Sequence, residues 1–249
     1  MSQESIRLAA VGDLHCTKAS GSELRGLFAQ AAESADILLL CGDLTDYGLP
    51  EEAHVLAEGL SVARIPAVAV LGNHDFESGQ QDEVRRILMS AGVHVLDGEA
   101  CEIHGIGFAG VKGFAGGYGR RALGPWGETT IKHFVNEAIQ EALKFESSLA
   151  KLRTSQRIGV LHYSPILATV EGEPIEIFPF LGTSRLEEPL IRYPVQAVFH
   201  GHAHRGQTEG KTANNIPVYN VAKPLLQRTY PDRPPFRIVE IPKSEAVSM

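Results

Sequence analysis

Acidic, amide and imidazole side chains occur together at several points of this sequence, each time directly after a short apolar run. In the segment Val68-Ala-Val-Leu-Gly-Asn-His-Asp75, a β-branched run ends at Gly72 and three polar residues follow. Asn73 can offer an amide oxygen to a cation, and His74 can move a proton near neutral pH. The same residues also suit a plain turn, because Gly-Asn is turn chemistry and such residues tolerate strained backbone. The other strand ends decide between these interpretations.

A similar group lies near the start of the chain, where the apolar run 6–11 stops at Gly12 and is followed by Asp13 and His15. Side chains separated by one residue point to the same side in extended geometry. A mixture of oxygen and nitrogen ligands suits a cation such as Mn²⁺, Fe²⁺ or Zn²⁺. The alternative is that Asp13 caps a turn and His15 packs nearby.

Three further apolar runs end in the same residue types. Asp43 follows the run 37–40, His162 follows 157–161, and His202 and His204 follow 196–200. One Asp or His after a strand is common, but turn formation alone does not readily explain an ordered set at five strand ends. The set predicts one site built from these candidate ligands: Asp13, His15, Asp43, Asn73, His162, His202 and His204.

Strand and helix patterns alternate in the part of the chain that must position these residues. Buried strands are expected at 6–11, 37–40 and 65–71, with amphipathic helices at 22–34 and 50–60 between them. Because parallel strands end at the same edge of a sheet, Asp13, Asp43 and Asn73 should lie side by side. The later elements are expected to be helices at 79–91 and 128–152, a β-meander or hairpins over 93–96, 100–103 and 106–110, and strands at 157–161, 196–200, 216–220 and 236–241.

Two irregular segments interrupt this alternation. Nine glycines lie between Gly105 and Gly127, together with basic and aromatic residues. We expect a long functional loop there, although a solvated connection fits the composition equally well. The segment 171–183 contains two prolines and is expected to form a rim of the site.

Composition limits the class of protein. The 249 residues, 43% hydrophobic and 21% charged, are enough for one domain over 1–249, which we prefer to two small ones. A net charge of -7 disfavours a general polyanion-binding surface, but a small phosphorylated substrate is compatible if metal ions supply local positive charge. The oligomeric state is left open.

The cysteines and the N-terminus indicate the compartment. Cys16, Cys41 and Cys101 include no C-x-x-C pair, and the first residues lack a basic start followed by an apolar block. No stretch is apolar enough to span a bilayer. We therefore expect a soluble, reduced, cytoplasmic protein without a membrane partner.

The ordered groups resemble the motifs of the calcineurin-like metallophosphoesterase superfamily. Those motifs are D-x-H, G-D-x-x-D, G-N-H-D/E, a lone His after a strand, and G-H-x-H, and all five occur here in that order between residues 13 and 204. The resemblance implies an α/β fold, a four-layer αββα sandwich in which helices flank two central mixed β-sheets. It also implies a binuclear metal centre at the carboxyl ends of the strands.

The resemblance assigns a metal to each half of the candidate set. It implies that Asp13, His15 and His204 hold the first ion, that Asn73, His162 and His202 hold the second, and that Asp43 bridges both. A shared carboxylate offsets the repulsion between two dications about 3.5–4 Å apart. Mn²⁺ is the expected metal, with Fe, Zn²⁺ or Co²⁺ as alternatives.

In the family, a bridging hydroxide attacks phosphorus in line. By resemblance, His74 protonates the departing oxygen and Asp46 orients His74, so the implied activity is hydrolysis of a phosphodiester or small phosphomonoester. Tyr47 stands where Ser/Thr phosphatases have a phosphate-clamping arginine, and Asp75 where they usually have Glu. Both departures favour the shorter bacterial-type phosphodiesterases and phosphatases.

Two residues of the glycine-rich segment are candidates for the missing clamp. Arg120 or Arg121 could contact the substrate phosphate, an idea that rests only on charge and placement. Other polar residues are expected to have no role in the site: His54, His94, His104 and His133 at the surface, and His200, Cys16 and Cys41 in the interior.

Two other classes of function remain as alternatives. A binding or scaffold protein on the same fold predicts missing ligands, and none of the seven is missing. A nuclease would need a basic groove that this acidic chain does not show, so nucleic acid is expected at most as a nucleotide or small fragment.

Overall fold

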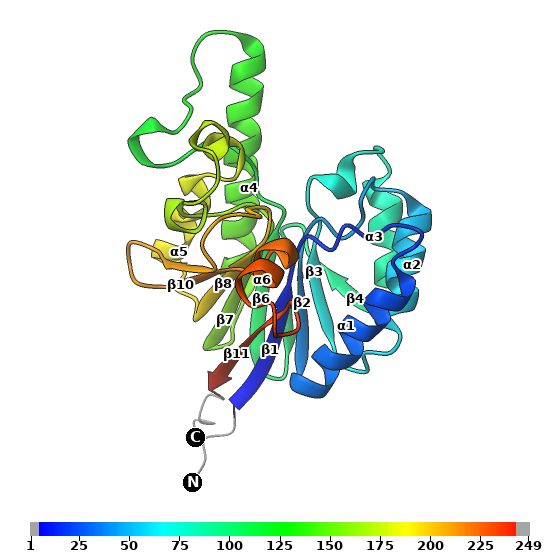
Figure 1. Cartoon of the computed structure of the whole chain (residues 1–249). Helices are drawn as coiled ribbons and strands as arrows, with labels where there is room; N and C mark the ends of the chain where they lie inside the picture. The colour runs from blue at the N-terminus through cyan, green and yellow to red at the C-terminus, as the bar shows by residue number, and fades with distance from the viewer. Residues whose placement is uncertain (1–4, 243–249) are drawn as a thin grey trace.

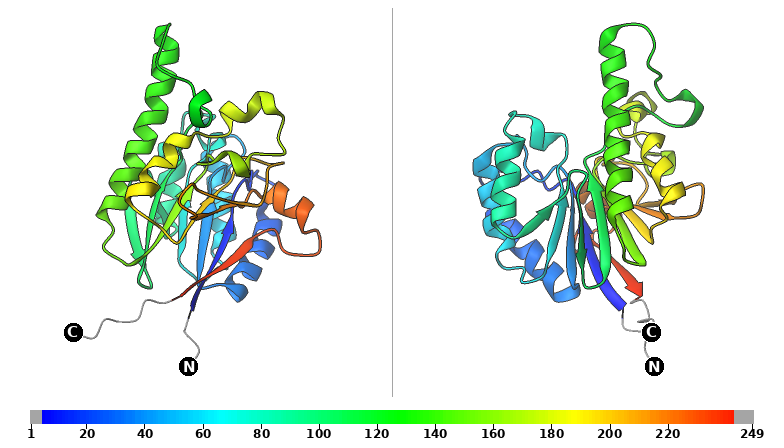
Figure 2. Two further views of the ribbon diagram at one scale, coloured as in Figure 1. Left: turned by 90° about the vertical axis from the view of Figure 1, so that its left-hand side faces the viewer. Right: turned by 180° about the vertical axis from the view of Figure 1, so that it is seen from behind.

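The computed structural model describes residues 5–242 and contains two β-sheets with helices on their outer sides (Figures 1 and 2). The strand order is β11-β1-β2-β3-β4 in the first sheet and β5-β6-β7-β8-β10-β9 in the second. This arrangement confirms the predicted sandwich of two mixed sheets. Within residues 5–242, no helix combines the length and apolar character needed to cross a membrane. Residues 1–4, part of the start expected to lack a signal peptide, lie outside the described range.

The first sheet is built from successive β-α units. Its first four strands run parallel, and β11 pairs antiparallel with β1 along the edge. The strands are buried on both faces, which explains why β2 reads as the unbroken apolar run Ile37–Cys41. The elements are β1 Ser5–Val11, α1 Gly21–Ser34, β2 Ile37–Cys41, α2 Pro50–Leu60, β3 Ala67–Val70, α3 Gln81–Ser90, β4 Val93–Val95 and β11 Arg237–Pro242.

The second sheet has four parallel strands, β6, β7, β8 and β10, with an antiparallel strand at each edge. The long helix α4 packs on β6 and extends beyond the ends of the strands (Figure 1). Its elements are β5 Ala100–Ile103, β6 Ile106–Val111, α4 Thr129–Lys151, β7 Gln156–Leu161, α5 Glu188–Arg192, β8 Ala197–His200, β9 Glu209–Lys211, β10 Pro217–Asn220 and α6 Lys223–Thr229. Five 3₁₀ turns complete the described structure: η1 His74–Phe76, η2 Gly119–Arg121, η3 Leu167–Thr169, η4 Ile175–Phe180 and η5 Ser184–Leu186.

The prediction of a β-meander or hairpins is confirmed for 100–103 and 106–110, which form a hairpin, and is wrong for 93–96. The runs 93–96, 100–103 and 106–110 do not form one meander, because β4 pairs parallel with β3 in the first sheet while β5 and β6 form a hairpin in the second. Helix α3 makes a crossover from β3 to β4, and such a crossover places the next strand beside its predecessor. The chain passes from one sheet to the other between Val95 and Ala100.

A fully apolar layer lies between the two sheets. It combines side chains from β1, β2 and β3 with others from β6, β7 and β8, and its largest members include Phe108 and Phe199. Two further apolar clusters lie beneath the outer helices. Because the same layer is shared by both sheets, their carboxyl ends are held in a fixed relation.

Glycines at these carboxyl ends allow turns from different strands to pack against each other. Gly42 has a φ of +79°, and a Cβ there would lie 2.4 Å from Nδ1 of His162. A Cβ on Gly72 would lie 2.2 Å from both the backbone nitrogen and Oδ1 of Asp43. The turns that carry Asp43, His162 and Asn73 therefore approach each other more closely than any side chain at these glycines would permit.

This packing predicts that Gly72→Ala destabilises the fold by about 1–3 kcal/mol, the usual cost of forcing an extra methyl group into a packed interior. Gly26→Ala is the matched control, because Gly26 is exposed on α1 with no atom within 4 Å of the added Cβ. The control should be neutral or stabilising by up to about 1 kcal/mol. Urea unfolding of both variants in EDTA measures the difference, and equal midpoints for Gly72→Ala and the wild type would contradict the packing.

Candidate metal centre

All seven candidate ligands follow the carboxyl ends of parallel strands. These strand ends form the upper edge of both sheets in Figure 1. Asp13 and His15 follow β1, Asp43 follows β2, Asn73 follows β3, His162 follows β7, and His202 and His204 follow β8. The structure gathers them into two adjoining clusters. Within each cluster, the ligand-type atoms lie within 4.8 Å of one another. The first contains Asp13, His15 and His204, and the second contains Asp43, His162 and His202, with Asn73 beside it.

The first cluster joins the two sheets. Oδ1 of Asp13 lies 3.0 Å from Nε2 of His204, and the backbone N–H of His202 donates to the same carboxylate at 2.9 Å. His15 uses Nδ1 to contact Asp46 at 3.1 Å. Its Nε2 is buried, has no hydrogen-bond partner in the described part of the chain, and lies 3.9 Å from Oδ2 of Asp43. A buried imidazole nitrogen without a partner is costly, and a cation held here would supply one.

In the second cluster, several hydrogen-bond acceptors with lone pairs face one another. Nδ1 of His162 lies 3.0 Å from the carbonyl oxygen of Cys41, which can only accept, so this nitrogen carries the proton. The remaining nitrogen, Nε2, then has a free lone pair and lies 2.9 Å from Oδ1 of Asn73 and 3.3 Å from Oδ1 of Asp43. Nε2 of His202 similarly donates to the carbonyl of Phe180 at 3.1 Å, which leaves its Nδ1 free. This donor set fits a divalent cation.

The charges around the clusters also fit metal ligands. Burial lowers the pKa of His202 to about 3, so its imidazole is neutral. Burial raises the pKa of the Asp13 carboxyl, but the hydrogen bond with His204 and the nearby imidazoles bring it below its ordinary value, so Asp13 is ionised. Among residues 5–242, no lysine or arginine forms an ion pair with Asp13 or Asp43. Ionised carboxylates and neutral imidazoles are the forms that bind metal.

His74 lies at the rim of the clusters, with its ring centroid 4.5 Å from that of His15. Its backbone N–H donates to Oδ1 of Asp43 at 2.8 Å, and its Nδ1 lies 2.7 Å from the backbone oxygen of Asp46. Burial lowers the pKa of His74, but this carbonyl and the carboxylates of Asp43, Asp46 and Glu77 outweigh it, so the net shift is upward.

Asp46 contacts His74 as predicted, but through its backbone and not through its carboxylate. The carboxylate of Asp46 contacts His15, whereas its main-chain carbonyl holds His74. The reason is a β-bridge between Cys16 and Thr45. Next to it, the backbone N–H of Asp46 donates to the carbonyl of Cys16, and this places Asp46 between the two histidines. Asp46 therefore positions both imidazoles, one through its side chain and one through its backbone.

The structural role of Asp75 was not predicted. This carboxylate is fully buried and accepts hydrogen bonds from the backbone N–H groups of Leu44, Thr45 and Gly72 and from the Thr45 hydroxyl, over 2.5–3.1 Å. It thus fastens the turn after β2, which carries Asp43, to the turn after β3. The signal available in the sequence was an acidic residue in the same block as the candidate ligands Asn73 and Asp43.

The predicted arginine clamp has no observed contact with the clusters. Arg120 and Arg121 lie in exposed η2, and no hydrogen bond or ion pair from either side chain is found within residues 5–242. The residues expected to have no role in the site lie as predicted: His54, His94, His104 and His133 are exposed, while His200, Cys16 and Cys41 are buried. Burial raises the pKa of Cys16 to about 12, so its thiol is protonated and is not a thiolate ligand.

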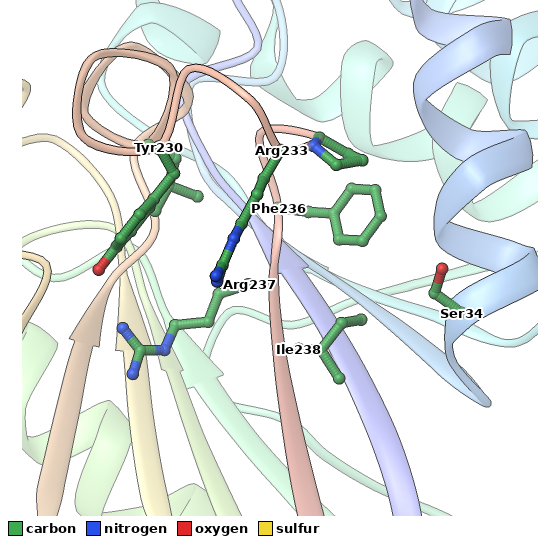
Figure 3. Close-up of a pocket in the computed structure, with 8 residues that line it drawn as sticks. Ser34, Tyr230, Arg233, Phe236, Arg237 and Ile238 are labelled. Atoms are coloured by element: carbon green, nitrogen blue, oxygen red, sulfur yellow. The ribbon is translucent and has the colours of Figure 1, made fainter.

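A separate pocket of about 430 Å³ lies between α1, α6 and β11 (Figure 3). It is lined by aromatic and basic residues that include Tyr230, Arg233 and Phe236, and by none of the seven candidate ligands. The guanidinium of Arg237 is already engaged there, because it pairs with Glu209 and lies 4.3 Å from the centroid of the Tyr219 ring. This pocket is not part of the candidate metal centre.

Solved structures share the fold of this chain at low sequence identity. A phosphopantetheinyl hydrolase from Mycobacterium tuberculosis aligns with a TM-score of 0.68 and 16% identity over 99% of this chain and 100% of its own. A protein of Thermus thermophilus aligns with a TM-score of 0.58 and 16% identity over 90% and 92% of the two chains. A putative 5'-nucleotidase from Staphylococcus aureus aligns with a TM-score of 0.51 and 15% identity over 87% of this chain and 48% of its own.

Sequence similarity gives a family but no individual relative. No curated protein matches the sequence. The model of the calcineurin-like phosphoesterase family matches residues 6–206, a range that contains both ligand clusters, His74 and Asp46. The chain therefore belongs to the calcineurin-like phosphoesterase family.

Proposed function

We propose that this protein hydrolyses phosphoester bonds with two divalent cations held at the strand ends. One ion would be held by Asp13, His15 and His204 and the other by Asn73, His162 and His202, with Asp43 available to both. The observation that carries the proposal is the convergence of unpaired acceptors, above all the buried Nε2 of His15 and the Nε2 of His162 facing two oxygens. Family membership supports the same reaction class.

Bound cations would lower the pKa of a water molecule and offset the negative charge of the phosphoryl oxygens. The position of Asp43 suits a shared ligand, because its two oxygens lie 3.9 Å from Nε2 of His15 and 3.3 Å from Nε2 of His162. Asp75 and the turn glycines hold Asp43 and Asn73 in this relation. The protein's own contribution is therefore to keep the ligands preorganised.

His74 is the proposed proton donor. In hydrolysis, an oxygen from water bonds to phosphorus, the bond from phosphorus to the departing oxygen breaks, and that oxygen gains a proton. Nδ1 of His74 is occupied by the Asp46 carbonyl, which leaves Nε2 to deliver the proton. Asp46 is a positioning residue for both His74 and His15.

The proposed substrate is a phosphodiester or a small phosphomonoester. A net charge of -7 favours a small anion over a long polyanion, since the cations supply positive charge locally. We assign Mn²⁺ as the metal, with Fe, Zn²⁺ or Co²⁺ as alternatives that accept the same ligands. Cys16, Cys41 and Cys101 are free, which fits a reducing compartment such as the cytoplasm.

Metal reconstitution tests the whole proposal. Protein stripped with EDTA and reloaded with Mn²⁺, Zn²⁺ or Co²⁺ should bind two equivalents and hydrolyse p-nitrophenyl phosphate, its bis ester, or both. Asp43→Asn should lower the metal content and reduce turnover by at least about 100-fold, because the shared carboxylate is lost. Metal is counted by mass spectrometry after dialysis, and initial rates are measured in parallel.

Asp232→Asn is the matched control, because Asp232 is exposed. It should retain wild-type metal content and rate. Full metal content and rate in Asp43→Asn would contradict the bridging assignment. Two bound metals without turnover of any mono- or diester would favour the scaffold alternative.

The fall in rate caused by removing His74 should depend on the leaving group. His74→Ala should retain both metals and lower the hydrolysis of an alkyl phosphodiester by about 10²–10⁴, the usual contribution of a positioned acid. The loss should be smaller for a p-nitrophenyl ester, because p-nitrophenolate departs without a proton. His133→Ala, exposed on α4, is the control. Equal losses for the two esters, or loss of bound metal, would remove the acid assignment.

The arginine clamp also remains a proposal. If Arg120 or Arg121 contacts the substrate phosphate, the double variant Arg120→Ala/Arg121→Ala should raise KM by about tenfold, as expected for one lost charge-assisted contact. Arg64→Ala changes an exposed arginine outside the segment and should leave KM unchanged. Steady-state kinetics on the better of the two nitrophenyl esters decides, and unchanged kinetics in the double variant would eliminate the clamp.

A further inference from the structure

An apolar cavity of about 490 Å³ lies beside the proposed metal centre. Three segments form it: the glycine-rich segment after β6, the first turns of α4, and the end of η4. Two of its aromatic residues are largely exposed, Trp126 at 64% and Phe180 at 58%. The side chains that line it are mainly Leu123, Trp126, Ile131, Phe134, Pro179 and Phe180.

The walls of this cavity are fastened to one another by backbone hydrogen bonds. The N–H of Gly116 donates to the carbonyl of Pro179 at 2.7 Å, and the N–H of Leu123 donates to the carbonyl of Gly116 at 2.8 Å. The N–H of Gly117 donates to the carbonyl of Gly182 at 2.9 Å. The glycine-rich segment is therefore anchored to the chain around η4, and the cavity is part of the folded structure. Figures 1 and 2 show this region beyond the upper ends of the strands, next to α4.

The cavity borders the second ligand cluster at Phe180. Phe180 belongs to both, because its carbonyl accepts from Nε2 of His202 at 3.1 Å while its side chain lines the cavity. Aromatic rings also pack between His202 and the cavity residue Phe134. Ring centroids are 4.4 Å apart between His202 and Tyr163, 6.1 Å between Tyr163 and Phe114, and 4.9 Å between Phe114 and Phe134. A group bound in the cavity would thus lie along one wall with a phosphate at the metal centre.

The charges along this wall favour an anionic amphiphile. Arg121 is the one charged residue that lines the cavity. Lys112 lines a different pocket, beside Leu71 and Phe76, and burial lowers its pKa. Arg121 thus places one positive charge on an apolar wall in a chain whose net charge is -7. A phosphate that carries an apolar group is complementary to this wall, because the apolar group can contact the apolar side chains. A carboxylate-rich partner lacks such a group.

We propose that the cavity is a subsite for the apolar alkyl or aryl group of a phosphoester whose phosphate lies at the metal centre. This inference rests on the proposed function and deepens it by naming a class of substrate. It gives the glycine-rich segment a specific role, which is to close the cavity against η4.

A binding experiment tests the subsite without turnover. Trp126 is the single tryptophan of the chain, so its emission reports directly on the cavity. Titration of the metal-reconstituted protein with hexylphosphonate should shift this emission to the blue and saturate, at a Kd at least about tenfold below that of methylphosphonate, because five more methylene groups leave water. In the metal-free protein, both phosphonates should bind more weakly, and hexylphosphonate should still bind more tightly than methylphosphonate.

A matched pair of variants locates the effect. Ile131→Ala removes side-chain carbons from the cavity wall, whereas Ile191→Ala makes the same change at an exposed position of α5 that is not part of the wall. The preference for hexyl over methyl should fall about fivefold or more in Ile131→Ala and stay unchanged in Ile191→Ala. Both variants retain Trp126, so the same emission titration measures phosphonate binding to each of them. A preference that does not change in Ile131→Ala would overturn the assignment.

The turnover experiment uses hexyl and methyl p-nitrophenyl phosphodiesters, which share one leaving group. The wild type should favour the hexyl ester by about tenfold in kcat/KM, and Ile131→Ala should reduce this preference. If neither ester is hydrolysed but the phosphonates show the chain-length preference, the proposed function fails and the subsite stands. If both esters are hydrolysed at equal kcat/KM and Trp126 emission does not respond, the subsite is overturned and the proposed function stands.

Discussion

Hydrogen bonds between the carboxyl edges of the two sheets are the interaction on which the rest of this structure depends. Asp13, from the first sheet, accepts from the backbone of His202 and contacts the ring of His204, both from the second sheet. In the same way, the carbonyl of Cys41 accepts from His162 at 3.0 Å. Asp13, Cys41 and His162 are buried, so the sheets cannot separate at this edge without leaving a carboxylate or a carbonyl unpaired. The contacts that fix the fold at this edge are also those that bring the ligand-type atoms together.

This arrangement has a conformational cost. Four of the seven candidate ligands adopt left-handed backbone conformations: Asp13 with a φ of 55°, His15 with 44°, Asp43 with 46° and His202 with 68°. Each such residue costs on the order of 1–3 kcal/mol, and the apolar layer between the sheets must offset that sum. Stability alone would favour glycine at these positions. That carboxylates and imidazoles occupy them instead is the pattern expected when the side chains have a chemical task.

The convergence of these side chains could be predicted from the sequence because the information that places them is local. The first three strands and β8 are largely apolar runs followed by a glycine within two residues, so these strands and their candidate ligands could be placed without knowing the fold. Features set by long-range contacts were missed. The orientation of Asp46 depends on the pairing of Cys16 with Thr45, and the role of Asp75 depends on donors 30 and 31 residues away. Short elements such as η4, α5 and α6 are too brief to show a hydrophobic period, so the region around 171–183 appeared only as an irregular rim.

The two parts of the site are built in different ways, and Phe180 is the residue that connects them. Its main-chain carbonyl orients the imidazole of His202, a contact that any residue at this position could make. Its side chain instead faces the apolar cavity, where size and shape matter. The ligands are held by strand ends and by buried carboxylates such as Asp75, whereas the cavity is formed by a glycine-rich segment and short 3₁₀ turns. Because the contact between η4 and His202 uses only the backbone of Phe180, side chains on this wall can vary without changing that contact.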